Sequence, residues 1–578
     1  MPDKALSNKA RTIFKDPVHN IIPVNDYEYA ILQHPILNRL HGIKQLGFTF
    51  FVYPQAKHSR FEHSIGVMHV AGKMADAIEV NTPEKISALL RSRCSFQDFK
   101  QIVRLSGLLH DIGHLPYSHI TELVLMEEVS SGRTSEELVK VVDEATRKGL
   151  KLHEYYSCLF AKKLANEIKK GWENGKKLSK YLASASHVLC KEEMGDSVLS
   201  PLGVGVVRRL ISGDILDADR IDYLARDAYN TGSTYGIIDI ERIISGLGLT
   251  SYDKELVLSI PSKLLSSIEE LYYARYMMYK WVYFHHKVIS IDLTYRSLLV
   301  GISKDWEKIR RKIARLFPGM PSNFWNLFLP SAIWNSSVKY GYKIDDSFID
   351  LILKVVASSD IPSLSLLSKG IINRRIPLYS VIKREEDIAT MLSSIADISE
   401  LKINPASLLD TLGSAFALIA NQKQTICDMM LKRLKIVESS CCSTPSALPN
   451  EILSCIAREY INSKLKEKSP NPPSIVSYIS LPISGGADST KLLLISDKNA
   501  FPVMNSSTIL QEIQRLGSRP LLYLYATKRP NESEKEEIKN AIASFLIELK
   551  KAIDVPEEGK NDEVLHRNSG VRTKQRRQ

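Results

Sequence analysis

The chain has 578 residues, of which 44% are hydrophobic and 25% charged, and its formal net charge is +12. Two or three domains are expected at this length, and the composition is that of a globular protein rather than a fibrous or disordered one. No apolar run approaches the roughly 20 residues of a membrane helix, the N-terminus lacks the apolar core of a secretory signal, and the seven scattered cysteines include no CxxC pair. We therefore expect an intracellular, cytoplasmic protein that has no membrane span, disulfide framework or zinc ribbon.

The N-terminal half is predicted to be helical after a short extended start. Residues 11–24 predict an extended segment with a turn at Asp16-Pro17. From there to about residue 247, apolar residues recur at three- and four-residue spacing, which is typical of packed helices. The stretch 127–151 is polar and charged, so a surface insertion is expected there.

The second half of the chain is predicted to be mostly helical at first and to contain strands near its end. Residues 250–261 alternate as in a small hairpin, a helical run covers roughly 263–300, and the helical region that follows carries no recognisable motif. After a proline-rich stretch near 470, the segments YISLPI, LLLIS and LLYLYAT predict strands, and a helix is expected at about 531–552. The predicted fold class is mainly α, a helical body with a smaller C-terminal α+β lobe. The expected domains are 1–300, 301–470, 471–553 and a disordered basic tail at 554–578.

Histidines are concentrated in the N-terminal part of the chain. Ten of the 14 lie between His19 and His153, whereas residues 287–565 contain none. Random scatter would not leave so long a stretch empty. The pattern indicates that the N-terminal half uses imidazole for a specific purpose.

The segment RLSGLLHDIGHLPYSH, residues 104–119, is the centre of this pattern. It places His110 and Asp111 inside an apolar helical repeat, and burying such a pair is costly unless it is ion-paired or binds a metal. A glycine and a proline then break the helix and bring His114 and His119 towards the same place. A lone His-Asp pair would be weak evidence, but here two further histidines follow within nine residues.

Two other segments supply further candidate ligands. HSRFEHSIGV places His63 in the first turn of a buried helix. In DADRIDYLARD, Asp219, Tyr223 and Asp227 follow at i, i+4 and i+8, so they share one helix face.

Single acids of this second helix are ambiguous. Any one of them suits a solvated helix face, and Asp222 with Arg226 suits a simple ion pair. Taken together, two imidazoles and two carboxylates form a mixed nitrogen and oxygen site that favours Fe, Zn, Mn or Ni over Ca. Such a site acidifies bound water and neutralises phosphoryl charge. Arginines that could clamp a polyphosphate are Arg60, Arg220 and Arg275.

These segments, in this order, resemble the HD superfamily, whose H…HD…D signature falls on His63, His110-Asp111 and Asp219. The narrower resemblance is to the deoxynucleoside triphosphate (dNTP) triphosphohydrolases, the branch of the SAM-and-HD-domain dNTPase of animals and its bacterial relatives. It covers about residues 11–300, with a looser match at LLYLYAT near the C-terminus. The matching phrases are KDPVHN, IKQLG, HSRFEHSIGV, LLHDIGHLPYSH, HEYYS, DADRIDYLARD and VYFHHKV.

The resemblance implies a role for each matching residue. The metal ligands would be His63, His110, Asp111 and Asp219. The catalytic group beside the phosphates would be His114, His119, His153 and Glu122, which stands where the animal enzyme has an aspartate. Phosphate contacts would be Arg60, Arg220, Tyr223 and Arg275. The sugar would be read by Gln45 and Asp227 at the 3′-hydroxyl, with Leu46 and Tyr283 packing at the 2′ position.

The implied reaction is hydrolysis of a dNTP to a deoxynucleoside and intact triphosphate. It would use a divalent transition metal, with Mg²⁺ on the nucleotide phosphates, in a homodimer or homotetramer. The guanine-nucleotide activator site of the animal enzyme does not match, because its positions fall on Thr12, Gln33 and His41. Another activator or none is therefore expected, and no SAM domain is expected before the HD region.

Two other functions are compatible with the same residues. The first is a different HD phosphohydrolase, a phosphodiesterase or nuclease acting on other nucleotides or oligonucleotides. The second is a nucleic-acid-binding protein with an inactive HD site, although all four ligand positions are intact. Weak nucleic acid binding by the basic tail is also compatible with the charge pattern.

Overall fold

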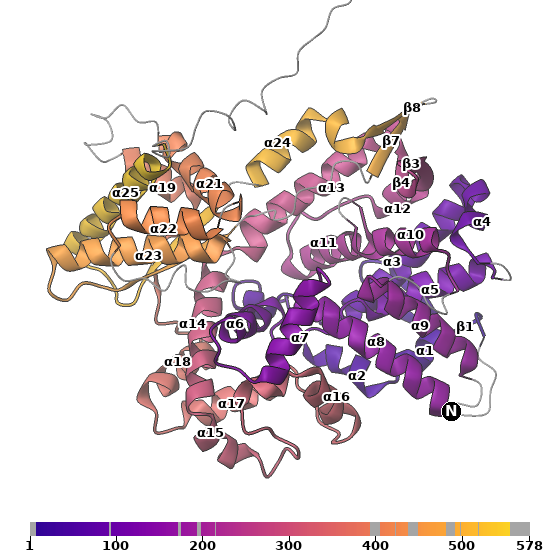
Figure 1. The fold of residues 1–578 in the computed structure, drawn as a ribbon, viewed down its shortest axis with the longest axis horizontal. Coiled ribbons are helices and arrows are strands. Elements are labelled where there is room, and N and C mark those ends of the chain that lie inside the picture. The colour runs from indigo at the N-terminus through magenta and orange to yellow at the C-terminus, as the bar shows by residue number, and fades with distance from the viewer. Residues whose placement is uncertain are drawn as a thin grey trace, which may run out of the picture. The chain divides into compact units, whose positions relative to one another are not determined.

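The fold is mainly helical, as the sequence predicts (Figure 1). The chain divides into two compact units, a larger one of Met1–Glu385, Thr444–Ala447 and Pro473–Arg529 and a smaller one of Glu386–Ser443, Leu448–Pro472 and Pro530–Gln578. The four domains expected from the sequence stay a prediction. The computed structural model describes residues 7–91, 94–171, 175–192, 198–213, 216–393, 405–421, 423–436, 449–480, 492–496, 499–517 and 520–554.

An antiparallel hairpin opens the larger unit. It consists of β1 (Ala10–Asp16) and β2 (Asn20–Asn25), with the turn at the predicted Asp16-Pro17 position. The Asp16 side chain accepts hydrogen bonds from the backbone amides of Val18 and His19, both at 2.9 Å. This local bonding is how aspartate stabilises a tight turn.

The helices that follow pack around α3 and α5, which are buried on most faces. α3 starts at a capping box, in which Ser59 and Glu62 satisfy the first free amides. Gly107 lets α5 cross α3 closely, because an added Cβ would lie 3.1 Å from the Met68 backbone. The elements are α1 (Asp26–Leu32), α2 (Pro35–Asn38), α3 (Arg60–Asn81), α4 (Ile86–Leu89), α5 (Phe96–Leu109), α6 (His119–Ser130), α7 (Glu136–Arg147), α8 (Leu152–Gly171), α9 (Lys176–Cys190), α10 (Pro201–Ser212), α11 (Ala218–Thr231) and α12 (Ile240–Ser245).

The predicted hairpin and long helix come next. The hairpin is confirmed as β3 (Gly248–Tyr252) and β4 (Glu255–Pro261). The helical run expected over 263–300 is instead two helices, α13 (Leu265–Met278) and α14 (His286–Lys304), separated by a π-helical turn at Tyr279–Tyr283. Continuous helical spacing gave no sign of this turn, and π-helical turns often mark functional sites.

The larger unit continues through short helices to its sheets. These helices are α15 (Trp306–Ile313), α16 (Pro330–Val338), α17 (Asp346–Ala357) and α18 (Pro362–Ile372). One more helix of this unit, α24 (Thr508–Gly517), comes later in the chain. The remaining strands are β5 (Tyr379–Ile382), β6 (Ile475–Ser480), β7 (Leu492–Ser496), β8 (Asn499–Pro502) and β9 (Leu521–Ala526).

The strands predicted at LLLIS and LLYLYAT are confirmed as β7 and β9, while β6 includes only the first three residues of YISLPI, whose other residues lie outside the described part of the chain. These strands complete sheets that begin much earlier in the chain. One sheet has the order β3-β4-β7-β8, in which β7 runs parallel to β4 with Leu258 opposite Leu492. The other has the order β5-β9-β6. Strand signals are local, whereas the choice of partner strand is not.

The smaller unit is helical in its described part. Its elements are α21 (Pro405–Asn421), α22 (Lys423–Arg433), α23 (Pro449–Lys468) and α25 (Glu532–Asp554), and α19 (Glu385–Ser393) lies at its boundary. α25 confirms the helix expected at about 531–552, and its Phe545 ring lies 5.7 Å from that of Tyr460 on α23. The basic tail at 554–578 lies beyond the described residues except for Asp554, so its predicted disorder and nucleic acid binding are not tested.

The cysteines differ from expectation. A disulfide joins Cys158 on α8 to Cys190 on α9, and Cys427 and Cys455 are also disulfide-bonded. The expectation of no disulfides is therefore wrong, because a sequence separation of 32 residues does not reveal that two antiparallel helices bring the thiols together. Among the described helices, none combines the length and apolar character needed to cross a membrane.

Candidate metal centre and adjoining pocket

His63 lies in the first turn of α3, where the cap made by Ser59 fixes the start of the helix. Its ring is fully buried. Nδ1 is 2.7 Å from Oδ2 of Asp222, and Nε2 is 3.0 Å from Oδ1 of Asp219. One nitrogen is therefore held by the protein interior while the other faces a half-buried carboxylate of α11.

His110 and Asp111 follow the last turn of α5. His110 Nδ1 is 2.8 Å from the Gly107 carbonyl oxygen, while Nε2 lies 3.3 Å from Oδ1 of Asp111 and 3.5 Å from Oδ1 of Asp219. His63 Nε2 is 3.7 Å from Oδ2 of Asp111. The four predicted ligands thus meet at one place although they come from α3, the end of α5 and α11.

This donor set fits a metal ion. Nε2 of both His63 and His110 is buried without a hydrogen-bond partner among the described residues, while Nδ1 of each ring has an acceptor. Such an acceptor on Nδ1 fixes the tautomer that turns the Nε2 lone pair towards a metal. Ligand atoms of His63, His110 and Asp111 lie within 4.8 Å of one another.

The electrostatics of the centre also favour a cation. Burial opposes a charged His63 ring, but Asp219 and Asp222 outweigh it and raise its pKa to about 10. Burial likewise opposes ionisation of Asp111, yet His110, His114 and Arg60 hold its pKa well below the usual range. The acids stay ionised and attract positive charge to the space between the two rings.

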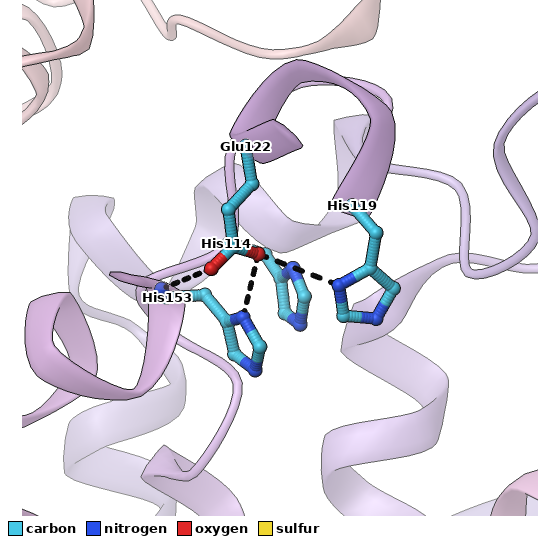
Figure 2. A group of neighbouring side chains, drawn as sticks. All are labelled: His114, His119, Glu122 and His153. Atoms are coloured by element: carbon cyan, nitrogen blue, oxygen red, sulfur yellow. Dashed lines mark hydrogen bonds and ion pairs between the residues drawn. The ribbon is translucent and has the colours of Figure 1, made fainter. Parts of the chain in front are cut away.

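A second group of side chains consists of His114, His119, Glu122 and His153 (Figure 2). Glu122 of α6 binds two imidazoles through Oε2, His153 Nδ1 at 2.8 Å and His119 Nδ1 at 3.4 Å. The His114 ring stacks on the His153 ring with centroids 4.0 Å apart, and His114 Nε2 lies 3.3 Å from Oδ1 of Asp111. His114 therefore contacts both groups, and the four residues of Figure 2 could themselves hold a metal ion.

Gly113 allows this close approach. An added Cβ would lie 2.2 Å from the carbonyl oxygen of His153 and 2.4 Å from the amide nitrogen of Ser157, both on α8. The loop after His110 can therefore press against the start of α8 only because this position lacks a side chain.

A further set of polar contacts is built around Asp227 of α11. Tyr283 donates its hydroxyl hydrogen to Oδ2 of Asp227 at 2.8 Å, and His58 Nε2 lies 2.7 Å from Oδ1. The π-helical turn delivers Tyr283 to this contact. Gln45 Oε1 is buried without a hydrogen-bond partner among the described residues, and Leu46 is half-buried beside it in the chain.

Arg220 and Arg275 carry buried donors that make no hydrogen bond to any described residue. Nε and Nη1 of Arg220 and Nε of Arg275 are buried with no hydrogen-bond partner in the described part of the chain. Asp217 caps α11 and lies 3.3 Å from Nη1 of Arg220. Burial raises the pKa of Tyr223, and the neighbouring guanidinium groups of Arg275 and Arg220 oppose part of that rise.

Arg60, for which a phosphate contact is expected, contacts protein groups in this structure. Its guanidinium pairs with Asp111, and its Nε donates to Ser118 Oγ at 2.8 Å. Two participants are new: His58, which holds Asp227, and Asp222, which holds His63. The sequence offered one signal for each of these residues. For His58 it was the first histidine of HSRFEHSIGV, and for Asp222 it was the ion-pair spacing with Arg226.

Comparison with known proteins agrees with this geometry. Residues 60–227 match the family model described as the HD domain. The chain is 30% identical over 288 residues to an uncharacterised protein of Methanocaldococcus jannaschii, covering 50% of this chain and 49% of that one. It is also 30% identical over 294 residues to the deoxynucleoside triphosphate triphosphohydrolase SAMHD1 homolog of Dictyostelium discoideum, covering 50% and 48%. The chain thus spans about half the length of these two relatives.

Similarity in fold extends further along the chain. A phosphohydrolase from Bacteroides thetaiotaomicron superposes with a TM-score of 0.54 at 22% identity, covering 90% of this chain and all of that one. The fold is helical, and residues 60–227, which match the HD domain, contain a histidine and aspartate cluster that could hold a metal ion. Proteins similar to the chain include the SAMHD1 homolog of Dictyostelium named above.

Proposed function

We propose that this protein is a metal-dependent phosphohydrolase that converts dNTPs to deoxynucleosides and triphosphate. The observation that carries the proposal is that Nε of Arg220, the residue next to Asp219, and Nε of Arg275 are buried without a hydrogen-bond partner among the described residues. Buried donors without acceptors are costly, and phosphate oxygens are the acceptors that a guanidinium fork matches. The Dictyostelium relative carries this activity in its name.

The metal would be held by His63, His110, Asp111 and Asp219, and Fe, Zn, Mn or Ni suits these donors. When bound, it supplies Lewis acidity towards a phosphoryl oxygen and lowers the pKa of water. We expect Mg²⁺ to accompany the phosphates of the substrate.

The histidine group beside the metal centre supplies proton chemistry. Water attacks the α-phosphorus, the bond to the 5′-oxygen breaks, and a histidine gives the leaving oxygen its proton. His119 suits that role, because its side chain is 58% exposed and Glu122 orients its Nδ1. Burial and the repulsion of Arg60 and His153 hold the pKa of His114 well below its usual range, so that ring binds as a neutral group.

The polar groups around Asp227 would bind the sugar. Asp227 and Gln45 offer acceptors to a 3′-hydroxyl, and Tyr283 with Leu46 would fill the place of a 2′-hydroxyl. Arg60, Arg220, Tyr223 and Arg275 would face the phosphates. Assembly into a homodimer or homotetramer stays a prediction.

The test is a product analysis. Purified protein is incubated with each dNTP and the matching ribonucleotides, singly and in pairs, with Mg²⁺ or Mn²⁺, and products are separated by ion exchange. Deoxynucleoside plus triphosphate, absent with Asp111→Ala, is the expected result. Monophosphate plus pyrophosphate, or hydrolysis of oligonucleotides alone, would point to a different HD phosphohydrolase. No hydrolysis of any substrate would contradict the proposal.

A further inference from the structure

Asp222 of α11 is a fully buried carboxylate whose two oxygens are both occupied. Oδ2 lies 2.7 Å from Nδ1 of the candidate ligand His63 and accepts from Nε of Arg226 at 2.9 Å. Oδ1 lies 2.6 Å from Nε2 of His19 and accepts from Nη2 of Arg226 at 2.9 Å. A surface ion pair would not combine a bidentate guanidinium with two imidazoles.

The contacts continue from Asp222 to the N-terminal hairpin. Arg226 Nη1 donates to Oδ2 of Asp16 at 2.8 Å, and Oδ1 of Asp16 accepts the amides of Val18 and His19. The turn between β1 and β2 is therefore connected to Asp222 by two routes, one through His19 and one through Asp16 and Arg226. Asp222 in turn contacts His63. His19 and Asp222 are 203 positions apart in the chain.

The backbone of α3 leaves room for this arrangement at one position. A Cβ on Gly66 would lie 1.9 Å from Oδ1 of Asp222 and 2.5 Å from Nη2 of Arg226. Gly66 follows His63 by three residues, so it lies on the same side of α3. Only glycine permits the buried carboxylate to approach the helix that carries the ligand.

A purely structural explanation accounts for less of this geometry. Replacing a buried ion pair by apolar residues is often neutral for stability, so an Asp222–Arg226 pair within α11 that served stability alone would have no need of a histidine on each carboxylate oxygen. An acceptor on Nδ1 of a metal-binding histidine, by contrast, fixes its tautomer and orientation and strengthens it as a ligand.

We propose that Asp222 is a positioning residue for the metal ligand His63, and that the hairpin turn at Asp16–His19 belongs to the metal centre through His19 and Arg226. The proposal rests on the metal role of His63 within the proposed function and not on the identity of the substrate. The metal affinity of this protein then depends on its N-terminal hairpin.

The test measures metal retention instead of turnover. Full-length wild type, Asp222→Asn and His19→Phe are purified identically and dialysed against EDTA, and transition metal per chain is followed by mass spectrometry over time. We expect both variants to lose metal about 10- to 100-fold faster than wild type. His19→Gln keeps a donor for Oδ1 of Asp222 and is expected to lie between wild type and His19→Phe.

Matched controls separate positioning from general damage. Asp98→Asn removes a half-buried carboxylate of α5 that pairs with Tyr181, and His187→Phe alters a half-buried histidine of α9. Both should keep their metal. Circular dichroism and melting temperature report folding, and His19→Phe keeps the test valid if Asp222→Asn does not fold.

Each remaining outcome has a definite meaning. Variants that melt earlier but keep metal as wild type does would show a structural role only and overturn the proposal. A wild type that retains no metal would overturn it as well. A wild type that holds metal but hydrolyses no dNTP would contradict the proposed function and leave this inference intact.

Discussion

Glu122 is the residue on which the histidine group depends. Its Oε2 binds Nδ1 of His153 and of His119, and its Oε1 accepts the His153 amide at 3.2 Å. Burial opposes its ionisation, but His153 and His119 hold the pKa of Glu122 well below its usual range. The side chain is therefore a fixed anion that orients two imidazoles at once.

We expect Glu122→Gln to lower kcat by about 100-fold with little change in KM, because a neutral amide offers one acceptor oxygen where the carboxylate offers two. Steady-state kinetics on the dNTP substrate measures both constants. Glu128→Gln is the matched control, since Glu128 is a buried acid of the same helix that pairs with Arg133 away from the histidines. An unchanged kcat in Glu122→Gln would remove the histidine group from the mechanism.

Helices α3 and α11 carry two of the four proposed metal ligands, His63 and Asp219, and Gly66 allows the two helices to lie close together. The Cβ distances of 1.9 and 2.5 Å to Asp222 and Arg226 are far below any van der Waals contact. The contacted groups belong to a fully buried ion pair, which has no free space into which to move. The metal centre therefore requires a glycine in the interior of a long helix, where glycine is otherwise unfavourable.

Gly66→Ala is expected to destabilise the protein by about 1–3 kcal/mol through overpacking and to weaken metal retention by displacing Asp222. Thermal melting and the metal assay measure the two effects. Gly205→Ala on α10 serves for comparison, because its Cβ would meet only Nη1 of Arg209, at 3.3 Å. The control should be neutral or slightly stabilising, since alanine favours a helix by up to about 1 kcal/mol. Equal changes in melting temperature and metal retention in the two variants would contradict the steric argument.

The stability of the larger unit as a whole should depend on pH through Asp292. α14 packs on β9, where Ile289 and Leu293 join Tyr523 and Tyr525 in one apolar cluster. Asp292 lies in this helix with no hydrogen bond or ion pair among the described residues, and burial raises its pKa from 3.8 to about 7. The folded protein therefore binds this proton more tightly than the unfolded chain does. The resulting stabilisation is complete below pH 3.8 and is lost as the pH rises through 7.

Asp292→Asn should raise the melting temperature by about 2–4 °C at pH 8 and by clearly less at pH 5, because the folded protein must increasingly give up its bound proton or carry a buried charge as the pH rises, whereas the neutral amide does neither. Melting curves of variant and wild type across pH 5–8 test this. Asp305→Asn, at the end of the same helix and partly exposed, should show no such pH-dependent difference. An equal difference in melting temperature between variant and wild type at all pH values would show that the effect comes from packing and not from ionisation.

Local patterns were sufficient for much of this protein. The helical character, the hairpin at β3 and β4 and the C-terminal strands follow from residue periodicity, which is a property of neighbouring residues. The ligand positions His63, His110, Asp111 and Asp219 could be chosen from sequence because buried histidines and acids stand out against an apolar helix pattern. Their meeting at one place agrees with that choice, and their role as metal ligands stays a proposal.

Other features depended on contacts between distant parts of the chain. The parallel pairing of β4 with β7, the disulfide between α8 and α9, and the π-helical turn that brings Tyr283 to Asp227 have no local signal. The largest difference concerns Asp222, which the sequence presents as half of an ion pair. Its contacts with His63 and His19 arise only when α3, α11 and the N-terminal hairpin pack together, because hydrogen bonds in a folded interior are selected by position in space and not by separation along the chain.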